Sequence, residues 1–117
     1  MSAWNRESRE LKLCYDMKRA RLDLGFARRQ TQLSLCIDLA KNELHYLNQQ
    51  MRHADAGELA GLKGRMDAVV EQIGKLSREK VELDFDRKNC LVSLARERAA
   101  EADALEAKYN REEVVAV

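Results

Sequence analysis

The sequence predicts an all-α protein, a long antiparallel helical hairpin of the coiled-coil type. The chain has 117 residues, no proline and only five glycines, so it lacks the regularly spaced turn residues that an all-β fold requires. Charged residues make up 35% of the chain and aromatic residues 5%, a balance typical of long helices and coiled coils. At this length we expect a single helical domain over residues 1–117.

The first helix is predicted over about residues 5–52, because apolar residues recur in it every eleven positions. We call this series the core line of the helix; it comprises Leu11, Tyr15, Leu22, Phe26, Leu33, Ile37 and Leu44. A repeat of eleven residues corresponds to roughly 3.67 residues per turn, so the line follows a nearly straight helix. From Leu33 onward the line, continued through Ala40, Leu47 and Met51, also fits a heptad repeat.

A second apolar line lies on another side of the first helix. This second line comprises Leu13, Met17, Leu24, Leu35, Leu39 and Tyr46. At about 100° per residue it lies roughly 160–200° from the core line, so one partner helix cannot cover both. Either the helix is buried in a three- or four-helix bundle, or the core line forms the hairpin and the second line binds a separate partner. We take the six residues as the predicted partner-binding site.

The chain reversal is predicted at about residues 53–57. Asp55 is followed three positions later by Glu58, the spacing of a capping box at a helix start. The second helix is then predicted over about residues 58–110, and residues 111–117 are predicted to be a frayed tail. An alternative for the apolar end of this tail, residues 114–117, is addition as a strand to a peptide-binding domain.

The second helix has one dominant apolar line. It comprises Leu59, Leu62, Met66, Val69, Ile73, Leu76, Leu91, Leu94, Leu105 and Tyr109. Between its two halves, residues 78–89 are rich in charge and poor in core residues. We interpret this segment as a solvated surface with internal ion pairs. The alternative is a polar layer or a docking patch.

The two halves of the chain differ in charge. Residues 1–52 contain ten basic and six acidic side chains, which gives a net charge of +4. Residues 53–117 contain eleven basic and fourteen acidic side chains, which gives a net charge of −3. An antiparallel hairpin brings these opposite charges together, and folding at residue 55 is predicted to place Arg29 near Glu82 and Asp84. Two apolar lines on one helix further predict that the hairpin is completed in a homodimer or a hetero-complex through helix packing.

We expect no catalytic, cofactor-binding or metal-binding residues in this chain. His45, His53 and Asp55 lie near the turn but lack a nearby thiolate, and we interpret them as surface residues rather than zinc ligands. Nucleic acid is not an expected partner, because the net charge is only +1. Three cysteines without metal-type spacing are expected to be small buried apolar residues; they are Cys14, Cys36 and Cys90.

The predicted function is non-enzymatic: a coiled-coil protein–protein interaction subunit, scaffold or adaptor of a larger assembly. The sequence shows neither an apolar signal segment nor a membrane-spanning stretch, so we expect a cytoplasmic protein. In length and helix–turn–helix layout the chain resembles the coiled-coil stalk proteins of flagellar and type III secretion ATPases. That resemblance implies an alternative function as a helical export chaperone or stalk component.

Overall fold

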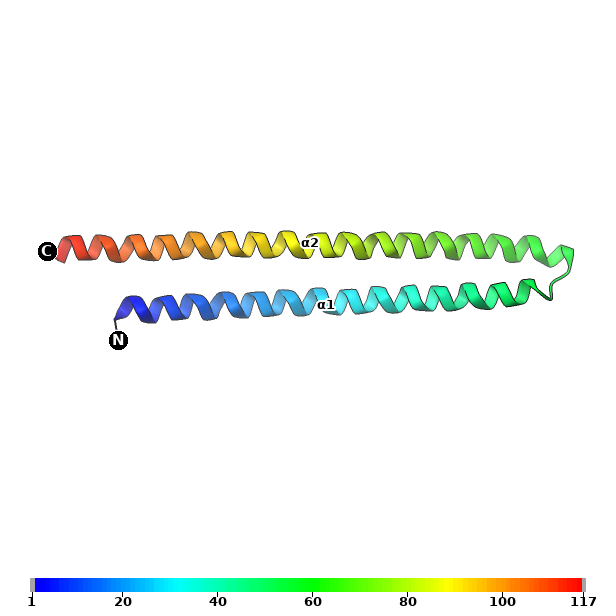
Figure 1. The fold of residues 1–117 in the computed structure, drawn as a ribbon, viewed down its shortest axis with the longest axis horizontal. Coiled ribbons are helices and arrows are strands. Elements are labelled where there is room, and N and C mark those ends of the chain that lie inside the picture. The colour runs from blue at the N-terminus through cyan, green and yellow to red at the C-terminus, as the bar shows by residue number, and fades with distance from the viewer. Residues whose placement is uncertain (1, 117) are drawn as a thin grey trace. The chain divides into compact units, whose positions relative to one another are not determined.

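The chain forms two long α-helices in a computed structural model, which describes the backbone of residues 2–116 and the side chains of residues 2–111. Helix α1 spans Ala3–Met51 and helix α2 spans Ala56–Ala116, and they run antiparallel (Figure 1). The predicted all-α helical hairpin is therefore confirmed. The side chains of residues 112–117 lie outside the described residues, so fraying and recognition of this tail stay predictions.

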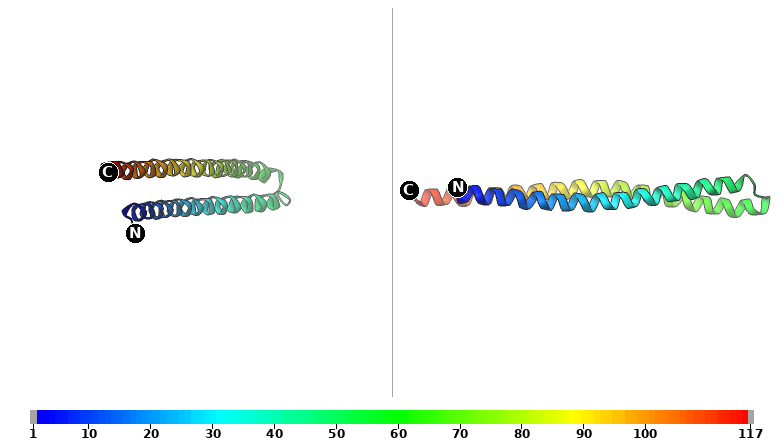
Figure 2. Two further views of the ribbon diagram at one scale, coloured as in Figure 1. Left: turned by 60° about the vertical axis from the view of Figure 1, so that its left-hand side comes forward. Right: turned by 90° about the horizontal axis from the view of Figure 1, so that it is seen from below.

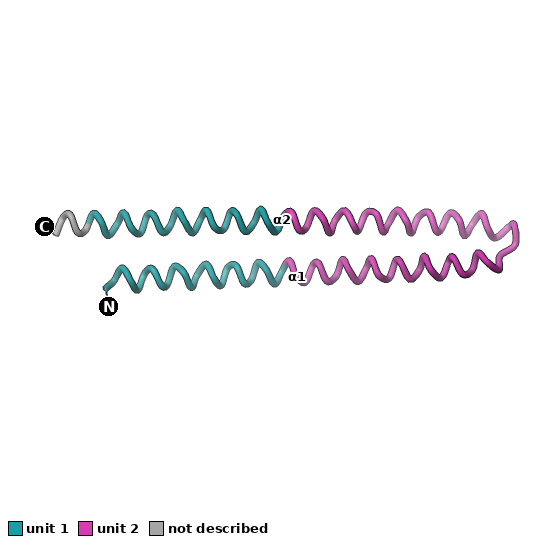
Figure 3. Tube along the Cα trace, in the orientation of Figure 1, with its two compact units in different colours: residues 1–25, 86–117 teal, residues 26–85 magenta. Residues whose placement is uncertain are grey.

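The hairpin divides into two compact units, each containing a segment of both helices (Figure 3). Unit 1 comprises Met1–Gly25 and Asp86–Val117, and unit 2 comprises Phe26–Phe85. Within each unit the α1 segment lies beside the α2 segment in Figure 1 and in the left view of Figure 2. In the two units, α1 and α2 are held together by different kinds of side chain.

Unit 2 contains an aliphatic core between its two helix segments. Ala40 and Leu47 of α1 pack with Val69 of α2, and Leu47 is completely buried. Leu44, Leu62, Met66 and Ile73 are partly buried and pack against this cluster. Leu33 and Ile37 are also buried. These residues belong to the predicted core lines, and the close heptad spacing near the turn lets them fill the interface between the helices.

Unit 1 is held by polar as well as apolar contacts. Tyr15 is its one buried hydrophobic residue among the described side chains, and its hydroxyl donates a hydrogen bond of 2.7 Å to Glu101 Oε1 on α2. The hydroxyl of Tyr109 likewise donates to Glu7 Oε2 at 2.8 Å. The guanidinium of Arg87 donates to the carboxylate of Asp23, with its Nη2 at 3.1 Å from Oδ1.

The turn between the helices has the predicted helix cap. Asp55 Oδ1 accepts a hydrogen bond of 2.9 Å from the backbone N–H of Glu58, which satisfies one of the free donors at the start of α2. The backbone N–H of Leu59 then donates to the carbonyl of Asp55, and the first helical turn is closed. The cap thus fixes the residue at which α2 begins.

Arg29 forms an ion pair with Glu79, Nη2 to Oε2 3.7 Å, a carboxylate about one turn from the predicted neighbour Glu82. One expectation about individual side chains is wrong. The cysteines are all exposed rather than buried; they are Cys14, Cys36 and Cys90. A helix that packs on one partner covers only a narrow stripe, and these positions lie outside it.

Candidate protein interaction surface

The six residues of the second line of α1 are all exposed. Their side chains retain between 50% of their accessible surface, for Met17, and 62%, for Leu13. In unit 1 the exposed members are Leu13, Met17 and Leu24; in unit 2 they are Leu35, Leu39 and Tyr46. The structure therefore separates the two apolar lines of α1, one against α2 and one facing solvent in the single chain. The partner-binding role of these residues remains a prediction.

Helical geometry explains why the second line of α1 stays uncovered. Leu33, Ile37 and Leu47 point toward α2 and are buried, whereas residues about half a turn away must point away from α2. Leu35 follows Leu33 by two positions, which is roughly 200° around the helix. The same relation holds for Leu13 and Tyr15 in unit 1, of which only Tyr15 is buried.

Helix α2 also carries exposed apolar residues, and the sequence analysis missed them. We call them the second line of α2; they are Val70, Val81, Phe85 and Val92. The three valines are spaced by eleven residues, the same repeat as on α1. This spacing was the signal that could have identified them. The charges of segment 78–89 conceal this repeat, because Val81 and Phe85 are interspersed with them. The exposure of Val81 and Phe85 is expected both for the predicted solvated surface and for a docking patch.

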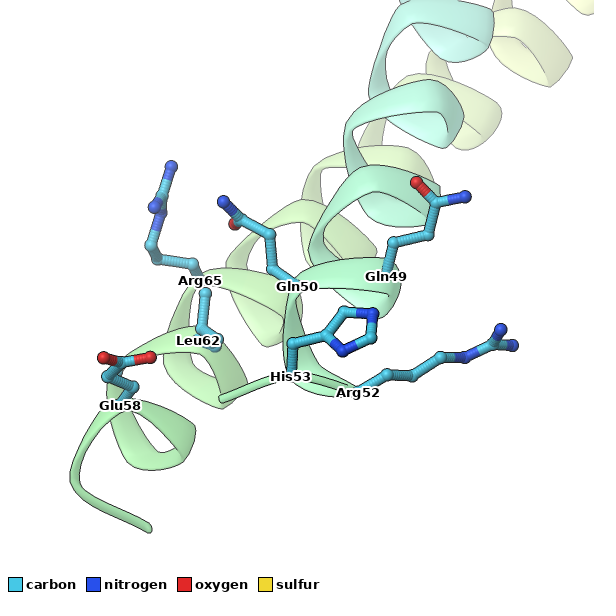
Figure 4. Close-up of a pocket in the computed structure, with 8 residues that line it drawn as sticks. Gln49, Gln50, Arg52, His53, Glu58, Leu62 and Arg65 are labelled. Atoms are coloured by element: carbon cyan, nitrogen blue, oxygen red, sulfur yellow. The ribbon is translucent and has the colours of Figure 1, made fainter. Parts of the chain in front are cut away.

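A hollow of about 870 Å³ lies at the turn in unit 2, where the side chains around it are mostly polar (Figure 4). Its lining residues include Gln50, His53 and Arg65, with Leu62 as the large apolar contact. His53 lies over the turn, and Arg52 extends away from it (Figure 4). We assign no ligand to the hollow because its polar groups do not converge on one point.

The described side chains, residues 2–111, contain no group of three or more His, Cys, Asp or Glu residues that could hold a metal ion. His45 lies near the turn but contacts Gln49, with 3.3 Å between the His45 Nε2 and Gln49 Nε2 atoms. Within the described part of the chain, neither helix has a stretch long and apolar enough to cross a membrane. The exposed apolar lines are therefore the features from which a function can be argued.

Two ionisable groups in unit 1 are shifted by the contacts between helices. The hydrogen bond to Glu101, together with burial, raises the pKa of Tyr15 to about 12. The hydrogen bond from Tyr109 lowers the pKa of Glu7 below its usual 4.5, and the positive charge of Lys108 acts in the same direction. Each shift reflects a contact that holds α1 and α2 together.

Comparison of the chain with models of protein families, with curated proteins and with solved structures finds no match.

Proposed function

We propose that the protein is a non-enzymatic interaction subunit, a scaffold or adaptor that binds other protein helices through the second line of α1. The observation that carries this proposal is the exposure of all six residues of that line. Apolar side chains that recur with helical periodicity on an exposed face are typical of a surface that packs against another helix.

The size of the exposed side chains supports this function. Burial of one Leu side chain stabilises an interface by about 1.5–3 kcal/mol. Leu13, Leu24, Leu35 and Leu39 lie on the line, so even partial burial of the four would offset a substantial part of the entropic cost of association. The three free, exposed cysteines are most compatible with a reducing compartment, and we place the proposed function in the cytoplasm.

A second candidate function is an export chaperone or stalk component. The observation that favours it is the layout itself, two helices of 49 and 61 residues joined by a short turn. The two candidates differ in the partner: a secretion ATPase or an exported protein for the second, and other subunits of an assembly for the first. Mass spectrometry of proteins crosslinked to the second line of α1 in cells separates them.

The test of the proposed function compares substitutions on the two lines of α1. We expect Leu24→Glu/Leu35→Glu to keep its helicity and to weaken partner binding by at least about 100-fold, because two apolar contacts are replaced by charges. Leu22→Glu/Leu33→Glu should instead unfold, since Leu33 is buried and a charge there would be desolvated. Circular dichroism measures the helicity, and titration of the crosslinked partner measures the affinity.

The matched control is Ala27→Glu/Gln32→Glu, which adds two glutamates to exposed positions of α1 that belong to neither line. It should retain both fold and partner. If this control loses the partner as well, the loss of binding is caused by the added negative charge and not by the removal of apolar side chains from the second line. If Leu24→Glu/Leu35→Glu unfolds, the second line is part of a core and the proposed function is wrong.

A further inference from the structure

In unit 2 the second line of α1 belongs to a longer exposed face with heptad spacing. Positions spaced alternately by four and three residues share this face from Arg28 to Tyr46. We call its six residues the symmetric face; they are Arg28, Gln32, Leu35, Leu39, Asn42 and Tyr46. All six are exposed, and at about 100° per residue they centre roughly 220° around the helix from the buried Leu33. The face therefore lies on the side of the α1 segment that α2 does not cover.

The symmetric face has the same order of side-chain kinds in both directions along the helix. About a midpoint at residue 37, the counterparts are Leu35 and Leu39, Gln32 and Asn42, and Arg28 and Tyr46. Leucine meets leucine, a carboxamide meets a carboxamide that can both donate and accept, and a guanidinium meets an aromatic ring on which it can stack. Two antiparallel copies of this face would make each of these contacts twice, because a two-fold axis repeats every contact.

The charges on this segment of α1 favour the same antiparallel arrangement. Residues 28–36 contain two basic and no acidic side chains, which gives a net charge of +2. Residues 38–46 contain one basic and two acidic side chains, which gives a net charge of −1. An antiparallel pair of α1 segments sets each positive half against a negative half, whereas a parallel pair in register sets like charges together.

One pair of flanking residues accounts for most of this charge complementarity. Arg29 and Glu43 lie on the same flank of the symmetric face, at equivalent heptad positions two heptads apart. In the antiparallel arrangement each would face the other residue of the second copy. Glu43 is exposed and forms no ion pair with another described residue, and Arg29 keeps 54% of its side-chain surface beside Glu79. Both charges are therefore accessible to a second molecule.

Helix α2 of another copy fits the symmetric face less well. Val81 and Phe85 are the exposed apolar pair on the middle of α2, and in an antiparallel contact they could cover the two leucines. Tyr46 would then lie opposite Gly74, which offers no side chain to its ring. The positive half of the face would lie opposite residues 84–92, which contain two basic and two acidic side chains and carry no net charge. The symmetric face is thus matched better by itself than by α2.

From these observations we propose that the symmetric face binds the symmetric face of a second copy of this chain, with the two α1 segments antiparallel about a two-fold axis beside residue 37. The proposal rests on the proposed function and names the occupant of the part of its surface that lies in unit 2. Because both copies use the same patch, the contact is isologous and closes at a dimer. On the flank opposite Arg29 and Glu43, each Asp38 would lie beside Asp38 of the second copy, the one like-charge contact between residues 28 and 46.

The main test exchanges the charges of the proposed ion pair. Glu43→Arg would set arginine against arginine, and Arg29→Glu would set glutamate against glutamate, at both ends of the dimer. We expect each variant alone to self-associate about tenfold more weakly than the unsubstituted chain. An equimolar mixture should recover the original affinity as a heterodimer, because both contacts then join an arginine to a glutamate. Sedimentation equilibrium at physiological ionic strength measures all of these affinities.

Two further measurements test the register of the contact. Asp38→Asn removes the like-charge contact and should strengthen self-association by about two- to fivefold. Cys36 is exposed and lies midway between Arg29 and Glu43 on their flank, so two copies of Cys36 would meet beside the axis. A short bismaleimide should join Cys36 to Cys36, as identified by peptide mass spectrometry. In a parallel dimer the two cysteines would lie on opposite sides of the interface and would not be joined.

The matched control is Lys41→Glu, the same reversal of charge as Arg29→Glu at an exposed position of α1 outside the symmetric face and its flanks. It should self-associate like the unsubstituted chain. Circular dichroism must show equal helicity for every variant, and Arg29→Gln replaces Arg29→Glu if the glutamate lowers it. The proposal is overturned if the mixture fails to recover affinity, if Cys36 is not joined to Cys36, or if the unsubstituted chain is monomeric at about 100 μM. In the last case the proposed function still stands if Leu24→Glu/Leu35→Glu loses a partner of different sequence.

Discussion

Unit 2 and unit 1 are built from the same two helices but are stabilised by different side chains. Five of the six buried hydrophobic residues lie in unit 2 and one, Tyr15, lies in unit 1. Unit 1 contains three contacts with side-chain hydrogen bonds between α1 and α2: Tyr15 with Glu101, Arg87 with Asp23, and Tyr109 with Glu7. The difference follows the sequence of α2, because its core line is closely spaced from Leu59 to Leu76 and sparser from Leu91 to Tyr109. Hydrophobic burial therefore fixes the turn end, and specific polar contacts hold the other.

The apolar core residues of unit 1 are also less deeply buried than those of unit 2. Leu11, Leu22, Leu94 and Leu105 are half-buried, whereas Leu33 and Leu47 of unit 2 are buried. Leu11 and Leu105 border a hollow of about 440 Å³. Apolar side chains that border open space lose part of their dispersion contacts. Core residues of unit 1 should consequently contribute less stability than those of unit 2.

The largest effect is expected from truncation of the core of unit 2. Leu47→Ala should lower the free energy of unfolding by about 2–5 kcal/mol, because Leu47 is completely buried and leaves a cavity. Leu11→Ala in unit 1 should lower it by only ~1 kcal/mol, because Leu11 is partly exposed and borders a hollow. Urea unfolding followed by circular dichroism measures both. Equal losses would show that the two units are equally well packed.

At alkaline pH we expect unit 1, and not unit 2, to lose a stabilising contact between the helices. The pKa of Tyr15 is raised from 10.0 to about 12 in the folded chain, so its hydrogen bond stabilises the fold fully below pH 10 and is lost as pH rises toward 12. The absorbance of the phenolate measures the titration, as the difference between the unsubstituted chain and Tyr15→Phe. A difference curve with its midpoint near pH 10 would contradict the contact with Glu101.

A smaller effect is expected on acidification. The pKa of Glu7 is lowered from 4.5 in the folded chain, first by the hydrogen bond from Tyr109, so this stabilisation is present above pH 4.5 and is lost as pH falls below it. Trp4, the single tryptophan, borders a hollow together with Tyr109, and its fluorescence should report the change. Tyr109→Phe should weaken the acid transition of Trp4, while circular dichroism of the whole chain changes little. An unaltered transition in Tyr109→Phe would exclude this contact as its cause.

Most of the fold could be predicted because helical periodicity and a missing proline leave few alternatives. The core line of α1 and the cap at Asp55 depend on neighbours in sequence, and both were identified from spacing. Contacts made by long charged side chains could not be predicted from spacing. Arg29 pairs with Glu79, and the positions of the charged residues in the sequence do not distinguish Glu79 from Glu82 as its partner. The second line of α2 was missed because Val81 and Phe85 are interspersed with charges, which conceal an apolar repeat when composition is read in short windows.

The hydroxyl–carboxylate contacts of unit 1 also determine whether the two helices can slide along each other. Within unit 1, a shift of one helical turn, about 5.4 Å, would separate the Tyr15 hydroxyl from Glu101 and the Tyr109 hydroxyl from Glu7, which are held at 2.7 and 2.8 Å. These two contacts therefore fix the axial register of the α1 segment against the α2 segment of this unit.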